Sequence, residues 1–524
     1  MKNKWLGILL TGVLLLAAGI VLLLVLPGER TVVYSNKGLD VALEAPAYLT
    51  VSEPEITEQV TEGTTDVTKT YTLNLLGMDV GTYALTERTL TNGSTFLFER
   101  AMNDGPLPFS LDTAISGLAG GDVTDWNPET VEHAYHSDFG MDPTVNPFGT
   151  VEFESGELLQ GQVYVSEPLV TTYPDGGESR LRELKSEVRN VEFSDGRLSK
   201  TIPLDRGEIG ESWALVSPEP LFSDDGTEAD WIDRSLHHQT EQLNWLTADG
   251  PYTKLPYSIE PSTKLGYGRT IGRIEDDVAL RWYNKTGAAF FETMVLNSRV
   301  NLLQYLEEFG GTRWPTEYTS TWLKNAYGVH APYVDTRYNE YTAFFLDKTA
   351  ALEPAAAPDS SAVVLYADFL LDRIEAGSVI ETEDGLLIVD YFDDDPDTPL
   401  THASLNHELG GLKILLSAYG KTGESKYLDA AELVITGIEQ FGQDAGGWIR
   451  ETGDLWYQAR PDGTFSGDDY PQLTLLDLIE TQNLLESLGL GRNAYFDELI
   501  DSKLAYLDSQ GVELIDKVTE AMEG

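Results

Sequence analysis

The chain has 524 residues, of which 41% are hydrophobic and none is cysteine, so it is a globular protein of more than one domain without disulfides, zinc thiolates or a cysteine nucleophile. Its 86 Asp and Glu residues outnumber 35 Lys and Arg, which gives a formal net charge of -51. Concentrated salt stabilises such a surface, since the Debye length falls to about 3 Å at 1 M, and no basic cluster is present to bind phosphate. We therefore expect a high-salt organism and no nucleic-acid partner.

The first predicted element is a membrane anchor at the amino terminus. Residues 5–26 form an almost uninterrupted run of Leu, Val, Ile, Ala and Gly, long enough to cross a hydrocarbon core of ~30 Å. Lys2 and Lys4 precede the run, and the positive-inside rule then places the bulk of the chain outside the cytoplasm. We expect residues 1–27 to form a cytoplasmic tip and a single-pass anchor in the cell membrane.

Residues 28–285 show the short, extended pattern of a β-rich region. Segments 82–89 and 95–100 flank an Asn-Gly turn, segments 188–193 and 198–202 flank an Asp-Gly turn, and both arrangements are typical of hairpins. Further glycine-rich turns indicate an antiparallel sandwich or barrel. A helix near residues 231–246 is expected at the junction with the next domain.

From about residue 286 to 524 the hydrophobic period changes from two to 3.6 residues, which predicts helices. Their expected ranges are 288–309, 317–327, 340–352, 361–376, 404–419, 425–441, 471–488 and 493–508. Consecutive helices, each apolar on one face and linked by loops of alternating length, predict an α/α toroid or a helical solenoid. The lack of a strict sequence repeat favours the toroid.

Four segments of this region combine polar and aromatic residues in the manner of a sugar-binding site: 314–328, 333–341, 391–406 and 446–471. Planar aromatic rings stack on pyranose faces, while charged and amide side chains hold hydroxyls and carboxylates. The predicted substrate-binding residues within or beside them are Asp335, Arg337, Asn339, Glu340, Asn406 and Arg450. The alternative is that the aromatic residues only fill the space between helices.

Two of these segments carry a resemblance to a known family. The run from Tyr391 to Pro399, YFDDDPDTP, precedes a helix that bears Asn406, and Gly446-Gly-Trp-Ile, Asp454-Leu and Asp469-Tyr470 follow in order. This order and spacing resemble the carboxy-terminal domain of the D-glucuronyl C5-epimerase family. The resemblance covers about a third of the chain and implies an α/α-barrel catalytic domain, an amino-terminal β-rich region and a homodimer.

The resemblance also implies a reaction, in which a base removes the proton next to a uronate carboxylate and an acid returns one from the opposite face. Tyr470 falls on a family tyrosine and Asp394 on the family's glutamate. Asp395 stands where the family has a loop tyrosine; the pKa of an aspartate in water is about 3.9, so this side chain is ionised without help. His402 is the predicted partner acid.

One further family tyrosine and its arginine are absent, because Gly453-Asp-Leu-Trp456 stands in their place. Tyr457, together with Arg450 or Arg460, could substitute from nearby. The predicted catalytic set is thus Tyr470, Asp394, Asp395, His402 and Tyr457, with Arg450 or Arg337 holding the uronate carboxylate.

The predicted function is a membrane-anchored, extracytoplasmic isomerase that epimerises uronic acids in an acidic cell-surface polysaccharide or glycan. A glycoside hydrolase or lyase on the same toroid is an alternative, since Asp394 or Asp395 with Glu451 would supply paired carboxylates. A non-catalytic glycan-binding envelope protein is another. No cofactor or metal is expected, although Asp390, Asp397 and the run 393–395 could bind calcium.

Overall fold

The computed structural model describes residues 27–36, 38–133, 141–238, 243–255, 258–261, 266–353, 361–393 and 398–523. Within them the chain divides into two compact units: unit 1 is drawn from Met1–Thr171, Arg180–Asn301 and Glu353–Ala355, and unit 2 from Thr172–Ser179, Leu302–Leu352 and Ala356–Gly524. The predicted domain boundary at 285/286 falls just before helix α6 (Ala289–Glu308), which contributes residues to both units.

The run that predicts the membrane anchor, residues 5–26, lies outside the described residues. Among the helices that the structure does describe, none has the length and hydropathy of a membrane span.

Unit 1 contains two antiparallel sheets. The first has the order β1-β2-β8-β15-β14 and consists of β1 (Pro27–Asn36), β2 (Leu39–Pro46), β8 (Phe109–Ser116), β15 (Arg197–Leu204) and β14 (Glu192–Ser194). The second is a 14-stranded sheet, with the main order β17-β18-β20-β13-β12-β16-β7-β6-β5-β3. Its strands are β3 (Thr50–Val51), β4 (Glu55–Thr61), β5 (Thr64–Leu75), β6 (Met78–Thr89), β7 (Thr95–Asn103), β9 (Asp122–Asp125), β10 (Gly149–Phe153), β11 (Gly156–Gln160), β12 (Val163–Thr172), β13 (Glu178–Val188), β16 (Ile209–Ser217), β17 (Asn244–Thr247), β18 (Gly250–Lys254) and β20 (Gly266–Gly268).

One hydrophobic core joins the two sheets. Leu43 on β2 and Leu111 on β8 come from the first sheet, Leu73 on β5 and Tyr83 on β6 come from the second, and all four are buried in the same cluster. Because alternate residues of each strand face this core, the sequence pattern of period two produces a sandwich. The prediction of an antiparallel β-rich region is confirmed.

Both predicted hairpins are present. Strands β6 and β7 pair across the Asn-Gly turn, and β14 pairs with β15 across Asp195 and Gly196, whose φ angles of 52° and 72° are those of a tight hairpin turn. The expected helix at 231–246 is partly wrong: α2 (Asp225–His237) covers its first half, but residues 244–247 form β17. The chain turns there at Gly250, whose φ is 107°, and starts a hairpin.

Unit 1 also contains two short helices ahead of α6, which are α4 (Ile271–Ile274) and α5 (Asp277–Thr286). The sequence analysis did not predict either helix, and α4, with four residues, is too short to repeat an apolar face.

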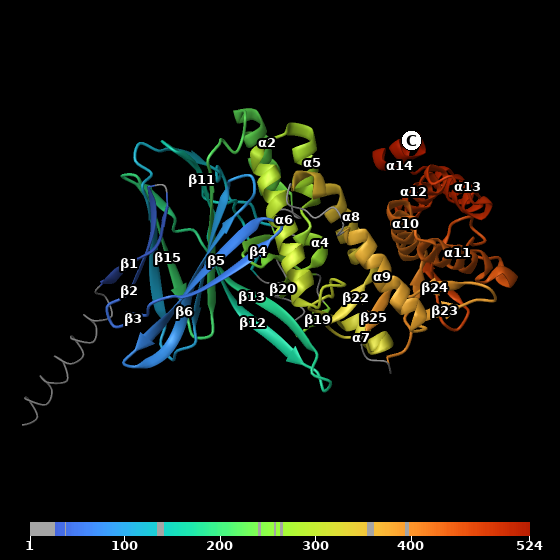
Figure 1. The fold of residues 1–524 in the computed structure, drawn as a ribbon, viewed down its shortest axis with the longest axis horizontal. Helices are drawn as coiled ribbons and strands as arrows, with labels where there is room; N and C mark the ends of the chain where they lie inside the picture. Colours follow the sequence, from blue (N-terminus) through green and yellow to red (C-terminus); the bar gives the residue numbers. More distant parts are fainter. Residues whose placement is uncertain are drawn as a thin grey trace, which may run out of the picture. The chain divides into compact units, whose positions relative to one another are not determined.

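Unit 2 is built from helices with short strands between them (Figure 1). The helices are α7 (Thr321–Tyr327), α8 (Thr336–Thr349), α9 (Ala362–Glu375), α10 (Leu405–Thr422), α11 (Ser425–Gln440), α12 (Leu473–Ser487), α13 (Ala494–Ser509) and α14 (Asp516–Glu523). The strands that matter for the site are β22 (Tyr333–Asp335), β24 (Leu386–Ile388), β25 (Tyr391–Asp393), β26 (Ala403–Ser404), β27 (Trp456–Ala459) and β28 (Phe465–Asp468).

Successive helices pack as α/α hairpins, so the coarse α/α prediction is confirmed. Helix α10 contacts α8, α9, α11 and α12, and most of its residues are buried. It is therefore the central helix of unit 2, whereas the sequence pattern indicated one buried face. Gly423, with a φ of 71°, ends α10 and allows α11 to return antiparallel after one further residue.

Two helices start at other residues than predicted. Helix α8 begins at Thr336 because the Asp335 carboxylate accepts hydrogen bonds from the backbone N–H groups of Arg337 and Tyr338, and α7 begins only after its cap, Ser320.

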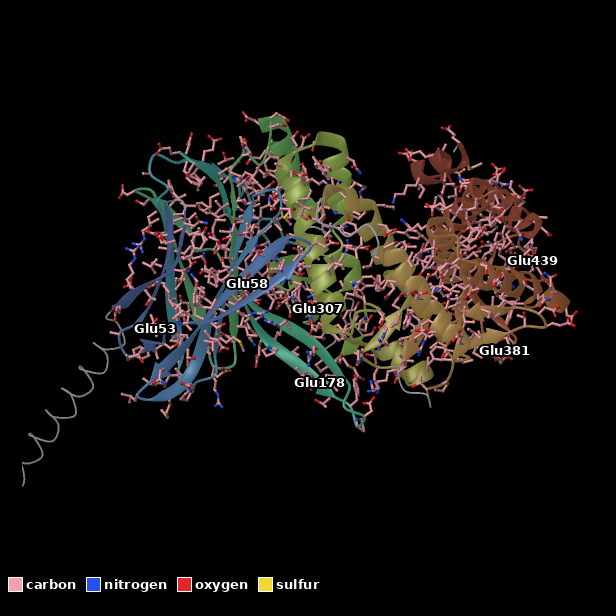
Figure 2. The ribbon with its side chains drawn as sticks, viewed as in Figure 1. Glu53, Glu58, Glu178, Glu307, Glu381 and Glu439 are labelled. Atoms are coloured by element: carbon pink, nitrogen blue, oxygen red, sulfur yellow. The ribbon has the colours of Figure 1, made fainter. Side chains whose placement is uncertain are left out.

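Carboxylates are distributed over the surfaces of both units, as the glutamates labelled in Figure 2 illustrate. Adaptation to high salt stays a prediction.

Candidate functional site

The centre of the candidate site is Asp390, a completely buried carboxylate between β24 and β25. Its Oδ1 accepts a hydrogen bond from the Ser404 backbone N–H (2.7 Å), and its Oδ2 accepts one from the Ser404 hydroxyl (2.6 Å). Nε2 of His402 lies 3.1 Å from Oδ2, and Nε2 of His407 lies 3.7 Å from it. Burial alone would raise the pKa of Asp390, but His407, His402 and Ser404 together lower it, so the group is an anion at neutral pH.

The first arm from this carboxylate runs through His402 to Tyr327. Nδ1 of His402 lies 3.0 Å from the Tyr327 hydroxyl. The Tyr327 hydroxyl can donate to Nδ1 when that nitrogen carries no proton, while Nε2 meets Asp390 at an ion-pair distance without the alignment of a hydrogen bond. Burial raises the pKa of Tyr327, and the positive charge of Arg460 opposes that effect. The order carboxylate, imidazole, hydroxyl is one that activates a hydroxyl for proton transfer.

The second arm consists of Ser404 and two of the predicted tyrosines. Burial raises the pKa of Tyr457, and the negative charge of nearby Asp390 raises it further. The Tyr470 ring meets that of Tyr457 edge to face at 5.5 Å and is 46% exposed. Asp390 therefore has a second tyrosine, Tyr457, within electrostatic range, and Tyr470 packs against that tyrosine.

Aromatic rings surround His402. The ring centroids of Trp322, Tyr327, Tyr391 and Tyr457 lie 5.6 to 6.2 Å from the imidazole. Trp322 and Tyr327 come from α7, Tyr391 from β25 and Tyr457 from β27. Strand β25 pairs with β22 and β26 pairs with β27, and these pairings bring residues far apart in the sequence to one place. Exposed Arg460 adds a cation within electrostatic range of the Tyr327 hydroxyl.

The structure corrects the prediction for His402. The sequence placed it on the open mouth of a helix as an acid that meets substrate, but it is 1% exposed, and its two nitrogens face Asp390 and Tyr327. The backbone N–H of Asp390 donates to the His402 carbonyl at 2.9 Å, which holds both residues at the base of the loop between them. His402 can act on a substrate only through Tyr327.

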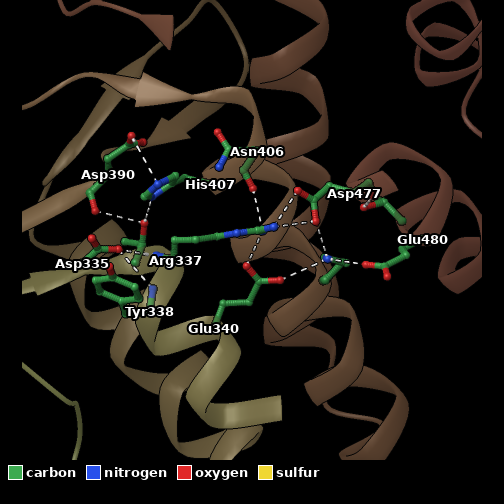
Figure 3. A network of polar contacts seen from close by, with 12 residues as sticks. Asp335, Arg337, Tyr338, Glu340, Asp390, Asn406, His407, Asp477 and Glu480 are labelled. Carbon is green, nitrogen blue, oxygen red and sulfur yellow. Dashed lines mark hydrogen bonds and ion pairs between the residues drawn. The ribbon is translucent and has the colours of Figure 1, made fainter. Parts of the chain in front are cut away.

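Arg337 is engaged in a buried ion-pair network and does not present a free guanidinium (Figure 3). Its nitrogens lie 2.6 Å from Glu340 and 2.8 Å from Asp477, and Lys413 lies 2.8 Å from Asp477 and 3.1 Å from Glu340. Glu480, at 2.7 Å, completes the contacts of Lys413. Both side chains join helices α8, α10 and α12, so the predicted substrate-binding roles of Arg337 and Glu340 stay predictions that would require this network to open.

Two other predicted binding residues, Asn339 and Asp335, have local structural roles. The binding role of a third, Asn406, stays a prediction. The buried Asn339 amide accepts from the backbone N–H of Trp314 and donates to the carbonyls of Trp314 and Asp335, so both of its N–H donors are already used. Asp335 caps α8, and burial raises its pKa. Asn406 accepts from Arg337 through its backbone carbonyl, while its own side-chain oxygen is buried and unpartnered among the described residues.

The remaining predicted residues lie at the rim or outside the described chain. Arg450 pairs with Asp468 at 2.5 Å and lies over the Trp456 ring at 4.8 Å, so its charge is already balanced. Glu451 is exposed on a turn. Asp394 and Asp395 lie outside the described residues, as does Asp397, so their predicted catalytic role and the calcium alternative stay predictions.

Sequence reasoning missed the two ends of the first arm. Asp390 was considered only as a calcium ligand, and Tyr327 and Trp322 were part of a segment, 314–328, that was noted only for its aromatic residues. The available signal was the short helix that carries both rings, which ends at Gly328 in the left-handed conformation. Nothing in the sequence indicates that this helix lies beside His402.

No protein-family model and no curated protein matches this sequence. Among solved structures the chain is similar to a D-mannose isomerase (17% identity, TM-score 0.31), with 45% of this chain covered. It spans 57% of that protein, which is less than two thirds of its length.

It is also similar to the cellobiose 2-epimerase from Bacillus thermoamylovorans (13%, TM-score 0.38, 55% of this chain and 71% of that one). A third similar structure is a family 76 glycoside hydrolase from a bovine Bacteroides thetaiotaomicron strain (11%, TM-score 0.35, 68% and 76%). Identities and TM-scores this low assign no activity to the chain.

Proposed function

We propose that this protein is a carbohydrate-modifying enzyme of the glucuronyl C5-epimerase type, which inverts the carbon next to the carboxylate of a uronic acid within a glycan. The observation that carries the proposal is that Tyr327 and Tyr470 each adjoin a side chain next to the buried carboxylate of Asp390: Tyr327 is hydrogen-bonded to His402, and Tyr470 packs against Tyr457. An epimerase needs an acid or base on each face of the reacting ring, and we assign one face to each tyrosine.

The proton movements follow from these contacts. The Tyr327 oxygen takes the proton from carbon 5 as its own hydroxyl proton passes to Nδ1 of His402, and the negative charge of Asp390 stabilises the imidazolium that forms. Tyr470 then gives its hydroxyl proton to the other face of the same carbon and regains one from solvent, while the imidazolium of His402 returns its proton by way of the Tyr327 oxygen as Tyr327 releases one to solvent. Arg460 is the cation that would balance the uronate carboxylate and the enediolate charge.

A glycoside hydrolase would need two carboxylates at the scissile bond. Among the described residues, Asp390 is completely buried and bonded to Ser404, and exposed Asp462 is another carboxylate within electrostatic range of Tyr327. We favour proton transfer over hydrolysis because the groups nearest His402 are tyrosines.

The decisive experiment incubates the purified protein with glucuronate polymers in heavy water at molar salt and measures deuterium at carbon 5. Wild type is expected to incorporate deuterium, and Tyr327→Phe to lose about 10²- to 10⁴-fold in rate. Tyr419→Phe on α10 is the matched control and should retain the wild-type rate, since it removes a hydroxyl away from Asp390. An absence of deuterium under all conditions would refute the proposal.

The same samples distinguish the alternatives. An unsaturated uronate chromophore would identify a lyase, and new reducing ends would identify a hydrolase. Glycan binding that survives in a Tyr327→Phe, Tyr470→Phe double variant, without turnover in wild type, would identify a non-catalytic glycan-binding protein.

The setting of the enzyme is also part of the proposal. We propose that the apolar run at residues 5–26 anchors it in the cell membrane of a high-salt organism, with the catalytic part outside, and that it forms a homodimer. Membrane fractionation and light scattering in molar salt would test these statements. Recovery of the full chain in the soluble fraction, or a monomer at all concentrations, would contradict them.

A further inference from the structure

Trp322 is an exposed tryptophan directly beside the proposed acid–base group. It is 51% exposed, whereas Trp126, Trp245, Trp314 and Trp448 are almost fully buried. Its ring meets the imidazole of His402 edge to face at 5.7 Å and the ring of Tyr327 at 6.2 Å. The indole is thus fixed against the site on one side and open to solvent on the other.

An indole in this position is suited to bind a sugar ring. Planar aromatic rings stack on the apolar faces of pyranoses, and a tryptophan offers the largest such surface of any side chain. Because the open side of Trp322 adjoins Tyr327, a sugar stacked on it lies next to the hydroxyl that moves the proton.

The proposed reaction decides which sugar this is. Inversion at carbon 5 requires one proton to leave from one face of the ring and another to arrive at the opposite face, so both faces of the reacting ring must be open to the tyrosines. A ring stacked on an indole has one face covered. The sugar on Trp322 is therefore not the one that reacts.

We infer that Trp322 forms a subsite for the sugar residue adjacent to the reacting uronate. This inference rests on the proposed epimerase function, which already places the uronate within a glycan. It adds the side chain that binds the neighbouring sugar.

The binding experiment uses the unreactive Tyr327→Phe protein and titrates methyl glucuronide and heparosan oligosaccharides into it at molar salt, with calorimetry and tryptophan fluorescence as readouts. The oligosaccharides should bind and the monosaccharide should bind much more weakly. Adding Trp322→Ala should weaken oligosaccharide binding about tenfold, and Trp322→Phe should restore most of it. Leu433→Ala, which removes an exposed apolar side chain from α11, is the matched control and should have no effect.

The turnover experiment separates this inference from the function on which it rests. In the otherwise wild-type enzyme, Trp322→Ala should raise KM for heparosan about tenfold with little change in kcat. Deuterium uptake by methyl glucuronide as efficient as by the polymer, or an unchanged KM in Trp322→Ala, would overturn the subsite and leave the epimerase intact. Binding that depends on Trp322 without any deuterium uptake by wild type would support the subsite and overturn the epimerase. Failure of every oligosaccharide to bind would overturn the inference.

Discussion

Replacing Asp477 by alanine is expected to destabilise unit 2 by about 3–5 kcal/mol, because it leaves two buried cations with one buried anion. Asp477 and Glu480 both contact the ammonium of Lys413, at 2.8 and 2.7 Å, but their side chains are 2% and 45% exposed. Asp477 also holds Arg337 at 2.8 Å, and Glu340 is a second buried carboxylate that contacts both Arg337 and Lys413. The loss of Asp477 therefore leaves one buried positive charge without a partner anion and without access to water.

Glu480→Ala removes a contact of equal length to the same ammonium, yet it should cost only about 0–1 kcal/mol, because solvent already screens the exposed carboxylate. The pair of variants thus isolates burial from distance. Urea unfolding of both proteins in molar salt, followed by circular dichroism of the helices, gives the two free energies of unfolding. Equal losses for the two variants, or a loss below about 1 kcal/mol for Asp477→Ala, would refute the reasoning.

Three further predictions concern pH and one buried hydrogen bond. Since the pKa of Asp390 is lower in the folded than in the unfolded protein, its stabilising effect is present above about pH 4 and lost as pH falls, so Asp390→Asn should approach wild type in urea unfolding at about pH 3. Burial raises the pKa of Glu408 well above its usual range, so wild type should lose stability relative to Glu408→Gln as pH rises above about 4, by up to about 1.4 kcal/mol per pH unit; parallel stability curves would contradict this. Ser179→Ala removes the acceptor of the buried Thr319 N–H (2.8 Å), which should cost about 1–3 kcal/mol and accelerate hydrogen exchange of that amide; unchanged protection would count against it.

Sequence periodicity was sufficient for the elements of the chain, because it reports the face that each element buries. The alternation of residues along β5 and β6 produced strands of one sandwich, and the predicted helices 425–441 and 493–508 match α11 and α13 to within one residue at each end. Local turn chemistry was equally direct at Asp195 and Gly196, where the residue types themselves permit positive φ.

The candidate site was predictable only in part. The segment 391–406 and the tyrosines Tyr457 and Tyr470 were identified as members of the site, and the structure does bring Tyr457 beside His402. The sequence could not show that His402 is buried or that Arg337 is neutralised, because both facts depend on partners more than sixty residues away in the chain, Tyr327 for the one and Asp477 for the other.

The sequence by itself determined the acidic surface, the lack of cysteine chemistry, the change from strands to helices and the aromatic character of the site, since each follows from composition or local spacing. Only the tertiary structure decided which charged residues are free to act. Burial of Arg337 and Glu340 among oppositely charged neighbours assigned them to helix packing, and the neighbours His407, His402 and Ser404 kept Asp390 ionised against the effect of its burial. The physical reason is that solvation and partner charges fix the state of an ionisable group, and both are properties of the folded surroundings.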